Sequence, residues 1–203
     1  MVKRWIKNYL MNNKYGVAVF SFIIFTGIVI GITTFLVADN DTRRIATEAV
    51  TGVLDLSAKE EFIKADIILN GLKSNLIFIF ILFIFSMTLF GKWGIYISVL
   101  IKGIALGIYI SILFNVFGFG YGLLVNILLV LLVNIIYIPS LIYICISLYN
   151  LNFDIFKMRN SGNISNSIIK SIFEVFIGFV LIFSSIIVEQ IMSAVMLNIY
   201  TKV

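Results

Sequence analysis

The fold is decided by the 22-residue block VAVFSFIIFTGIVIGITTFLVA, which runs from Val17 to Ala38 without a charged side chain. A helix of about 20 apolar residues is long enough to cross the hydrocarbon core of a bilayer. A cleavable signal peptide has a shorter apolar region, of about 7–15 residues, followed by a small-residue cleavage site. This block is longer and runs into Asp39 without such a site. We therefore predict a retained first transmembrane helix over residues 17–38.

The rest of the chain has the same apolar character. Hydrophobic residues make up 61% of the 203 residues, and charged residues make up 12%. A soluble domain has about 45–50% apolar and about 25% charged residues. The chain therefore lacks the polar surface that a water-facing domain needs. We predict a single all-α membrane domain, residues 1–203, built as a multi-pass bundle of about five transmembrane helices in the cell membrane.

Four further apolar segments complete the predicted bundle. A turn at residues 91–94 separates the second span from the third, and the three glycines within 118–122 mark the next turn. Pro139 lies inside the fourth span, where it removes one backbone hydrogen bond and favours a kink. The predicted spans after the first cover residues 75–90, 93–117, 121–151 and 171–199.

The distribution of charge predicts the orientation of the bundle. The arm 1–16 has four basic residues and no acidic residue, whereas the loop 39–74 has seven acidic and five basic residues. Basic segments are retained on the cytoplasmic side of a membrane. The loop 152–170 has three basic residues and one acidic residue, so it is also predicted to be cytoplasmic. We therefore predict an N-terminus inside, a C-terminus outside and an outer loop at 39–74.

The outer loop contains an apolar stripe at helical spacing, which predicts an amphipathic helix. Such a helix lies on the outer membrane surface or binds a partner. It can equally cover the ends of the transmembrane helices. The stripe is our candidate partner surface, and it consists of Ile45, Ala49, Val50, Val53 and Leu54.

The intramembrane polar residues that we single out in the predicted spans are Lys102, Asn126, Asn134 and Glu189. A charged side chain in hydrocarbon is unfavourable and usually faces the bundle interior with a partner. Such groups either fix one arrangement of the helices or form a path for a proton or an ion. A path needs a series of titratable groups, and only Lys102 and Glu189 lie deep. This favours the structural interpretation.

Two pairs of glycines have the spacing that lets membrane helices approach closely. Gly27 and Gly31 lie in the first span, and Gly103 and Gly107 lie in the third. We predict that these faces, together with the helix around Pro139, contact protein rather than lipid, either in this chain or in another subunit.

The sequence shows no motif for catalysis, for a cofactor or for a metal. There is no histidine, and the one cysteine, Cys145, lies in an apolar helix. A structural zinc site needs about four nitrogen or sulfur ligands. No positioned nucleophile and base are recognisable. The basic residues lie between apolar blocks rather than on one soluble face, which argues against nucleic-acid binding. We predict a protein that is not an enzyme.

The order of these features resembles one family over essentially the whole chain. A basic arm and Gly27-x-x-x-Gly31 come first, followed by the outer loop 39–74. Lys102-Gly-Ile-Ala-Leu-Gly107, Asn134-Ile-Ile-Tyr-Ile-Pro139 and Glu189 follow in that order. Together they resemble the stage II sporulation protein M family of endospore-forming bacteria.

The resemblance implies a function, a location and partners. It implies a scaffold in the mother-cell septal or engulfing membrane. This scaffold recruits stage II sporulation proteins D and P, which remodel septal peptidoglycan during engulfment in sporulation. An alternative hypothesis is a small transporter or channel subunit that uses Lys102 and Glu189. A homo-oligomer is compatible with either.

Overall fold

The structure is a computed structural model, and it describes residues 13–59, 65–157 and 164–200. Every element in these ranges is a helix, so the predicted all-α membrane fold is confirmed for this part of the chain. The elements are α2 (Lys14–Val37), α3 (Asn40–Lys59), α4 (Ala65–Ser86), α5 (Gly91–Val125), the π-helix η1 (Asn126–Leu131), α6 (Leu132–Lys157) and α7 (Ile164–Tyr200). The basic residues of the arm 1–12 lie outside the described ranges.

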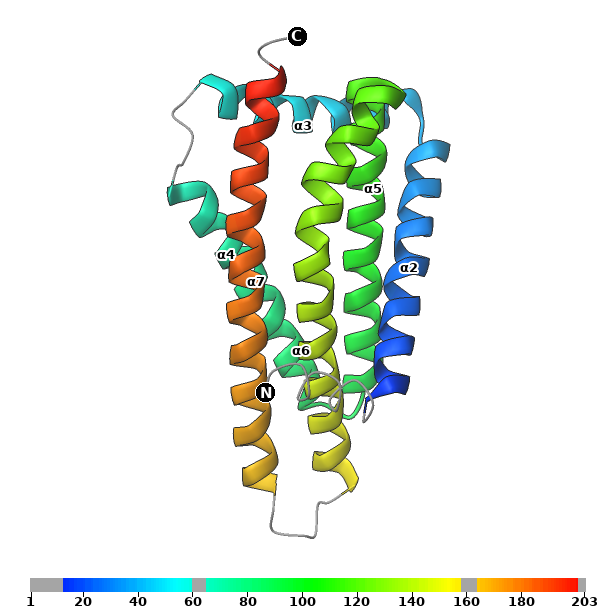
Figure 1. The fold of residues 1–203 in the computed structure, drawn as a ribbon. Helices are drawn as coiled ribbons and strands as arrows, with labels where there is room; N and C mark the ends of the chain where they lie inside the picture. Colours follow the sequence, from blue (N-terminus) through cyan, green and yellow to red (C-terminus); the bar gives the residue numbers. More distant parts are fainter. Residues whose placement is uncertain (1–12, 60–64, 158–163, 201–203) are drawn as a thin grey trace.

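Four stretches of the described chain are long and apolar enough to cross a membrane. They are Lys14–Val37, Leu69–Ser86, Gly91–Phe156 and Ser165–Glu189. The third has 66 residues and is interrupted at Gly118, whose φ of +70° is not helical. In Figure 1 the chain follows α5 to one end of the bundle, turns there, and returns as η1 and α6. The molecule therefore has four to five long apolar helices, depending on whether this stretch is counted once or twice.

Several helices extend beyond the spans predicted from the sequence. Helix α4 begins at Ala65 instead of residue 75, so it includes the last part of the predicted outer loop. Helix α6 ends at Lys157, and α7 begins at Ile164, so both reach into the predicted loop 152–170. Polar residues can continue a helix past the hydrocarbon core, because the backbone hydrogen bonds of a helix are made within the segment itself.

The turn between α4 and α5 lies at residues 87–90 and not at 91–94, where the sequence predicted it. Gly91 is the first residue of α5, and a Cβ added there would be 2.2 Å from the Phe85 carbonyl oxygen. The buried Asn152 of α6 donates hydrogen bonds from Nδ2 to the carbonyls of Ser86, at 2.9 Å, and Thr88, at 2.8 Å. This side chain supplies donors that carbonyls at a helix end lack.

The core lies where five helices meet. Helix α2 packs along α5, α6 packs along α7, and α4 runs obliquely across the bundle (Figure 1). The centre is filled by side chains that are almost fully buried, among them Phe20, Leu82, Ile95, Leu148 and Ile182. Many large apolar side chains are exposed on the outside of the same helices. This distribution suits a bundle whose solvent is lipid.

The four predicted packing glycines face one another between α2 and α5. A Cβ on Gly27 would lie 2.9 Å from the Cα of Gly103, and one on Gly31 would lie 2.2 Å from the Ile104 carbonyl oxygen. A Cβ on Gly107 would likewise lie 2.2 Å from the Ile28 carbonyl oxygen. The two backbones therefore touch at these positions, which leaves no room for a larger side chain. Both glycine faces are occupied within the chain.

Helix α3 lies across one end of the bundle (Figure 1). Asn115 of α5 donates a hydrogen bond from Nδ2 to the hydroxyl of Thr47 at 3.1 Å, which fixes one side of α3 against the bundle. Ile45 is 65% exposed, and Ala49 is also exposed. The side chains of Val50, Val53 and Leu54, the rest of the predicted stripe, lie outside the described part of the structure.

Candidate functional site: a lipid-facing groove and the intramembrane polar side chains

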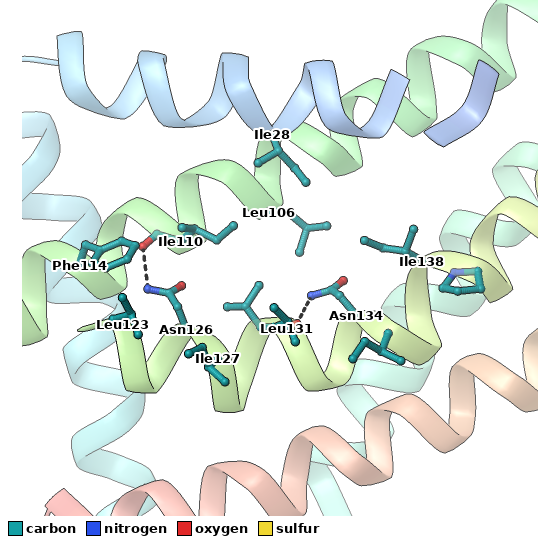
Figure 2. A pocket seen from close by; sticks show the side chains of 13 residues that line it. Ile28, Leu106, Ile110, Phe114, Leu123, Asn126, Ile127, Leu131, Asn134 and Ile138 are labelled. Carbon is teal, nitrogen blue, oxygen red and sulfur yellow. Dashed lines mark hydrogen bonds between the residues drawn. The ribbon is translucent and has the colours of Figure 1, made fainter. Parts of the chain in front are cut away.

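A groove of about 690 Å³ opens between α2, α5 and the leg formed by η1 and α6. Ile28, Leu106 and Ile110 form one wall. The other wall is also apolar except for two amides, Asn126 and Asn134. Figure 2 shows both amides on the same side of their helical leg, directed toward the wall that contains Leu106 and Ile110. The groove is thus an apolar slot with two polar points along one side.

The Asn126 amide connects the two legs of the folded-back stretch. Its Nδ2 donates to the Gly122 carbonyl at 2.8 Å and, more weakly, to the Ile110 carbonyl of α5 at 3.4 Å. Its Oδ1 is buried and has no hydrogen-bond partner in the described chain. A buried acceptor without a donor is unfavourable, and each such group requires an explanation.

The Asn134 amide lies two helical turns further along the same leg. Its Nδ2 donates to the Val130 carbonyl at 2.7 Å, and no described residue donates to its Oδ1. The structure places this amide in the groove.

The backbone beside these amides is irregular. The six residues of η1 form a π-helix, an arrangement that is rare and is frequent at functional sites. Pro139 lies inside α6 on the edge of the groove, and its missing N–H leaves the carbonyl one turn earlier without its helical donor. The helix continues through Pro139, so the irregular turn lies upstream of the proline.

Lys102 contacts an aromatic ring and not a carboxylate. Its Nζ lies 4.7 Å from the ring centroid of Phe78 on α4, and it forms no ion pair with Glu189 within the described residues. A lysine over an aromatic face gains about 0.5–2 kcal/mol, depending on how far it is desolvated. A direct Lys102–Glu189 ion pair is therefore absent from this part of the chain.

Polar groups from four helices come near one another around Glu189. The hydroxyls of Tyr109 on α5 and Tyr137 on α6 lie within electrostatic range of the Glu189 carboxyl group. The Tyr137 hydroxyl donates to Asn75 Oδ1 of α4 at 3.0 Å, and Asn75 Nδ2 donates to the Gly71 carbonyl at 2.9 Å. The two tyrosines do not stand out in the sequence, because aromatic residues within apolar runs resemble their apolar neighbours. Asn75 does not stand out because it lies at the edge of a predicted span.

A second, polar pocket of about 270 Å³ lies between α6 and α7 at the opposite end from α3. All of its lining residues are polar. Ser147 is buried there, and its hydroxyl has no partner among the described residues. Lys170 and Glu174 form an ion pair at 3.9 Å. The lining residues are Asn13, Ser147, Asn150, Asp154, Ser167, Lys170, Ser171 and Glu174.

An apolar layer separates this pocket from the cluster around Glu189. Tyr137 and Ser147 are ten residues apart on α6, which is about 15 Å along a helix. Leu141 and Ile144 lie between them, and Ile182 of α7 is in the same core cluster. All three side chains are at most 2% exposed. The interface of α6 with α7 is therefore polar at both ends and closed by packed side chains in the middle.

The described residues hold no group of three or more His, Cys, Asp or Glu side chains that could bind a metal ion. Cys145 is fully buried in the core of α6, where it acts as a small apolar side chain. The arrangement provides shape and hydrogen bonding. Its features are a groove that opens to lipid, a helix across one end of the bundle, and paired polar groups that fix the helices.

Comparison with protein-family models, with curated proteins and with solved structures gave no match in any of the three.

Proposed function

We propose that the chain is a non-enzymatic membrane scaffold that presents α3 to partners on the outer side of the membrane. One observation carries the proposal: α3 is held against the bundle by specific polar contacts, while Ile45 stays 65% exposed. A helix held in one orientation needs less ordering on binding, and this preorganisation favours affinity.

Four hydrogen bonds support the idea that α3 is preorganised. Asp39 caps its first turn, since the Thr42 N–H donates to Asp39 Oδ2 at 3.2 Å. Arg43 of α3 donates to the Ala38 carbonyl at 2.8 Å and to the Leu36 carbonyl at 2.5 Å, at the C-terminal end of α2. A cation at a helix C-terminus is favourable. Thr47 accepts the hydrogen bond from Asn115. The turn into α3 and its first half are thus attached to α2 and α5.

The proposed orientation has the N-terminus in the cytoplasm and α3 outside. Its support is the charge asymmetry between the arm 1–16 and the loop 39–74. Peptidoglycan lies on that outer side. The family resemblance then suggests the partners, stage II sporulation proteins D and P, and the place, the mother-cell septal or engulfing membrane. In this proposal the scaffold localises enzymes that cut the cell wall and has no hydrolase activity itself.

The test places two charges on the exposed side of α3. The double variant Ile45→Glu/Ala49→Glu is expected to insert normally and to lose co-purification of the two peptidoglycan-degrading partners, because both positions are exposed. The matched control is Leu89→Glu/Phe90→Glu, which adds two charges at exposed positions of the turn at the other end of the bundle. Equal recovery of the partners by both variants would contradict the proposal.

A small transporter or channel subunit is the second candidate, and the polar groups of α4, α5, α6 and α7 favour it. The substitution Lys102→Met separates the two functions. Lys102 lacks an ion-pair partner within the described chain, so a scaffold keeps its partners after this change. A transporter that depends on Lys102 stops moving its substrate. Loss of ion or proton flux in vesicles, with partner recovery unchanged, would favour the transporter.

A further inference from the structure

A row of side chains, which we call the seam, follows the leg of the chain that returns from the turn at Gly118. It consists of Leu124 at the end of α5, Ile127 and Leu131 in the π-helix η1, and Asn134 and Ile138 in α6. Leu124, Ile127 and Leu131 are 55%, 42% and 53% exposed, so the described helices of the chain leave these three side chains partly uncovered.

The groove lies directly beside this seam. Ile127, Leu131, Asn134 and Ile138 line it on one side, and Leu106 and Ile110 line it on the other. Helices pack by placing a ridge of side chains into a groove of the neighbour. Each copy of the chain has such a ridge beside such a groove. In a pair of copies, the ridge of each copy can therefore lie in the groove of the other. This is the geometry of a two-fold, self-complementary interface.

The Asn134 side chain favours a second copy of the chain, rather than a lipid acyl chain, as the occupant of the groove. Its Nδ2 is bonded to the Val130 carbonyl, which leaves its Oδ1 and one N–H without a partner in the described chain. Unmet polar groups are unfavourable in hydrocarbon, and asparagine side chains hydrogen-bond across membrane helices. A carboxamide has both a donor and an acceptor, so it is complementary to another carboxamide. An acyl chain offers neither.

Copies of one membrane protein insert with the same orientation, so a two-fold axis between two copies runs along the membrane normal. Residues with the same number then lie at the same depth, and the Asn134 amides of two copies face each other. The other close-packing surface, the glycine faces of α2 and α5, is occupied within the chain. We propose that two copies associate through the seam 124–138, with their Asn134 amides hydrogen-bonded across the axis. This inference does not depend on the proposed scaffold function.

Cysteine crosslinking in the intact chain tests the geometry. In membranes, Leu131→Cys is expected to form an oxidised dimer in high yield, because seam positions lie next to a two-fold axis. The matched control is Ile191→Cys on α7, which has the same 53% exposure. Helices α6 and α7 are antiparallel. Leu131 lies 26 residues before the end of α6 at Lys157, and Ile191 lies 27 residues after the start of α7 at Ile164. The two positions therefore lie at a similar depth. The native Cys145 is buried and is therefore not expected to form a crosslink.

The role of the amide is tested by energy transfer between labelled copies in vesicles of decreasing protein-to-lipid ratio. Asn134→Leu is expected to weaken the dimer by about threefold to thirtyfold, the range that interhelical hydrogen bonds of this kind give. Asn134→Gln keeps the carboxamide and is expected to retain more of the affinity. Equal crosslinking at positions 131 and 191, or a monomer at every lipid ratio, would overturn the proposal. An unchanged dimer affinity in Asn134→Leu would show that the Asn134 amide does not contribute to the interface.

Discussion

Gly107 shows how one missing side chain determines the packing of two helices. A Cβ there would overlap the Ile28 carbonyl oxygen at 2.2 Å, whereas a Cβ on Gly120 would have no atom within 4 Å. Inserting even one carbon into a tightly packed contact destabilises a fold by about 1–3 kcal/mol. We expect Gly107→Ala to lower the free energy of unfolding in detergent by that amount. Gly120→Ala should change it by less than about 0.5 kcal/mol. Equal effects of the two would contradict the contact between α2 and α5.

Asn152 is the polar residue on which the turn between α4 and α5 depends. It is 2% exposed and bonds the carbonyls of Ser86 and Thr88. Removing the donor leaves the buried Ser86 carbonyl unsatisfied, which costs about 1–3 kcal/mol, whereas the Thr88 carbonyl still accepts from the Gly91 N–H at 3.0 Å. Asn152→Leu should therefore reduce the free energy of unfolding by about that amount. Asn150→Leu, at an exposed position of the same helix, is the control and should have little effect. A stable Asn152→Leu variant would show that the turn does not need this side chain.

At the scale of the element, the first turn of α3 should respond to pH through Asp39. Hydrogen bonds from the Thr42 hydroxyl and backbone N–H stabilise the carboxylate, and they hold the pKa of Asp39 below its ordinary value of 3.8. A lowered pKa means that the charged cap stabilises the fold above the pKa of the unfolded chain. This contribution is lost as the pH falls through the folded-state value.

We therefore expect hydrogen-exchange protection at Thr42 and Arg43 to be constant near neutral pH and to fall below about pH 4, near the pKa of an unfolded aspartate. Asparagine caps helices as well as aspartate does but has no carboxylate to protonate. In Asp39→Asn the protection should therefore lose this pH dependence. An acid-induced loss that persists in Asp39→Asn would assign the effect to another group.

The helices could be predicted from the sequence because long apolar runs have few alternatives in lipid. Their ends could not, since residues 65–74 and 152–157 are too polar to be counted in a span and yet continue the helices in the structure. The turn at residues 87–90 was missed for a similar reason. Its stability comes from Asn152, which is more than sixty residues away in the chain.

Parts of the candidate site could also be predicted. Lys102, Asn126, Asn134 and Glu189 stand out because they are polar within apolar runs. Their partners do not stand out, because partners depend on how each helix is rotated about its axis. The ring of Phe78 under Lys102 and the hydroxyl of Tyr137 beside Glu189 are examples. The groove is another feature of this kind, since it exists only where α2 and α5 meet the leg formed by η1 and α6 in the folded chain.

At the scale of the whole molecule, the proposed scaffold function depends on the orientation of the bundle in the membrane. The basic arm and the acidic outer loop predict that α3 faces outward and that the turn at residues 87–90 faces the cytoplasm. A membrane-impermeant thiol reagent applied to intact cells should therefore label Ile45→Cys and leave Leu89→Cys unlabelled. The side chains at both positions are exposed, 65% for Ile45 and 78% for Leu89. A difference in labelling therefore reports the side of the membrane on which each position lies. The reverse pattern would place α3 in the cytoplasm and remove the proposed access to peptidoglycan.

In the proposed scaffold, α3 is the surface on which partners assemble. This role is tested most directly by a photo-crosslinking amino acid at position 45 in sporulating cells, with position 89 as the control at the other end of the bundle. Position 45 is expected to capture a membrane-anchored, peptidoglycan-degrading protein, and position 89 is not. Capture of lipid alone at position 45, or of the same protein at both positions, would contradict the scaffold role of α3.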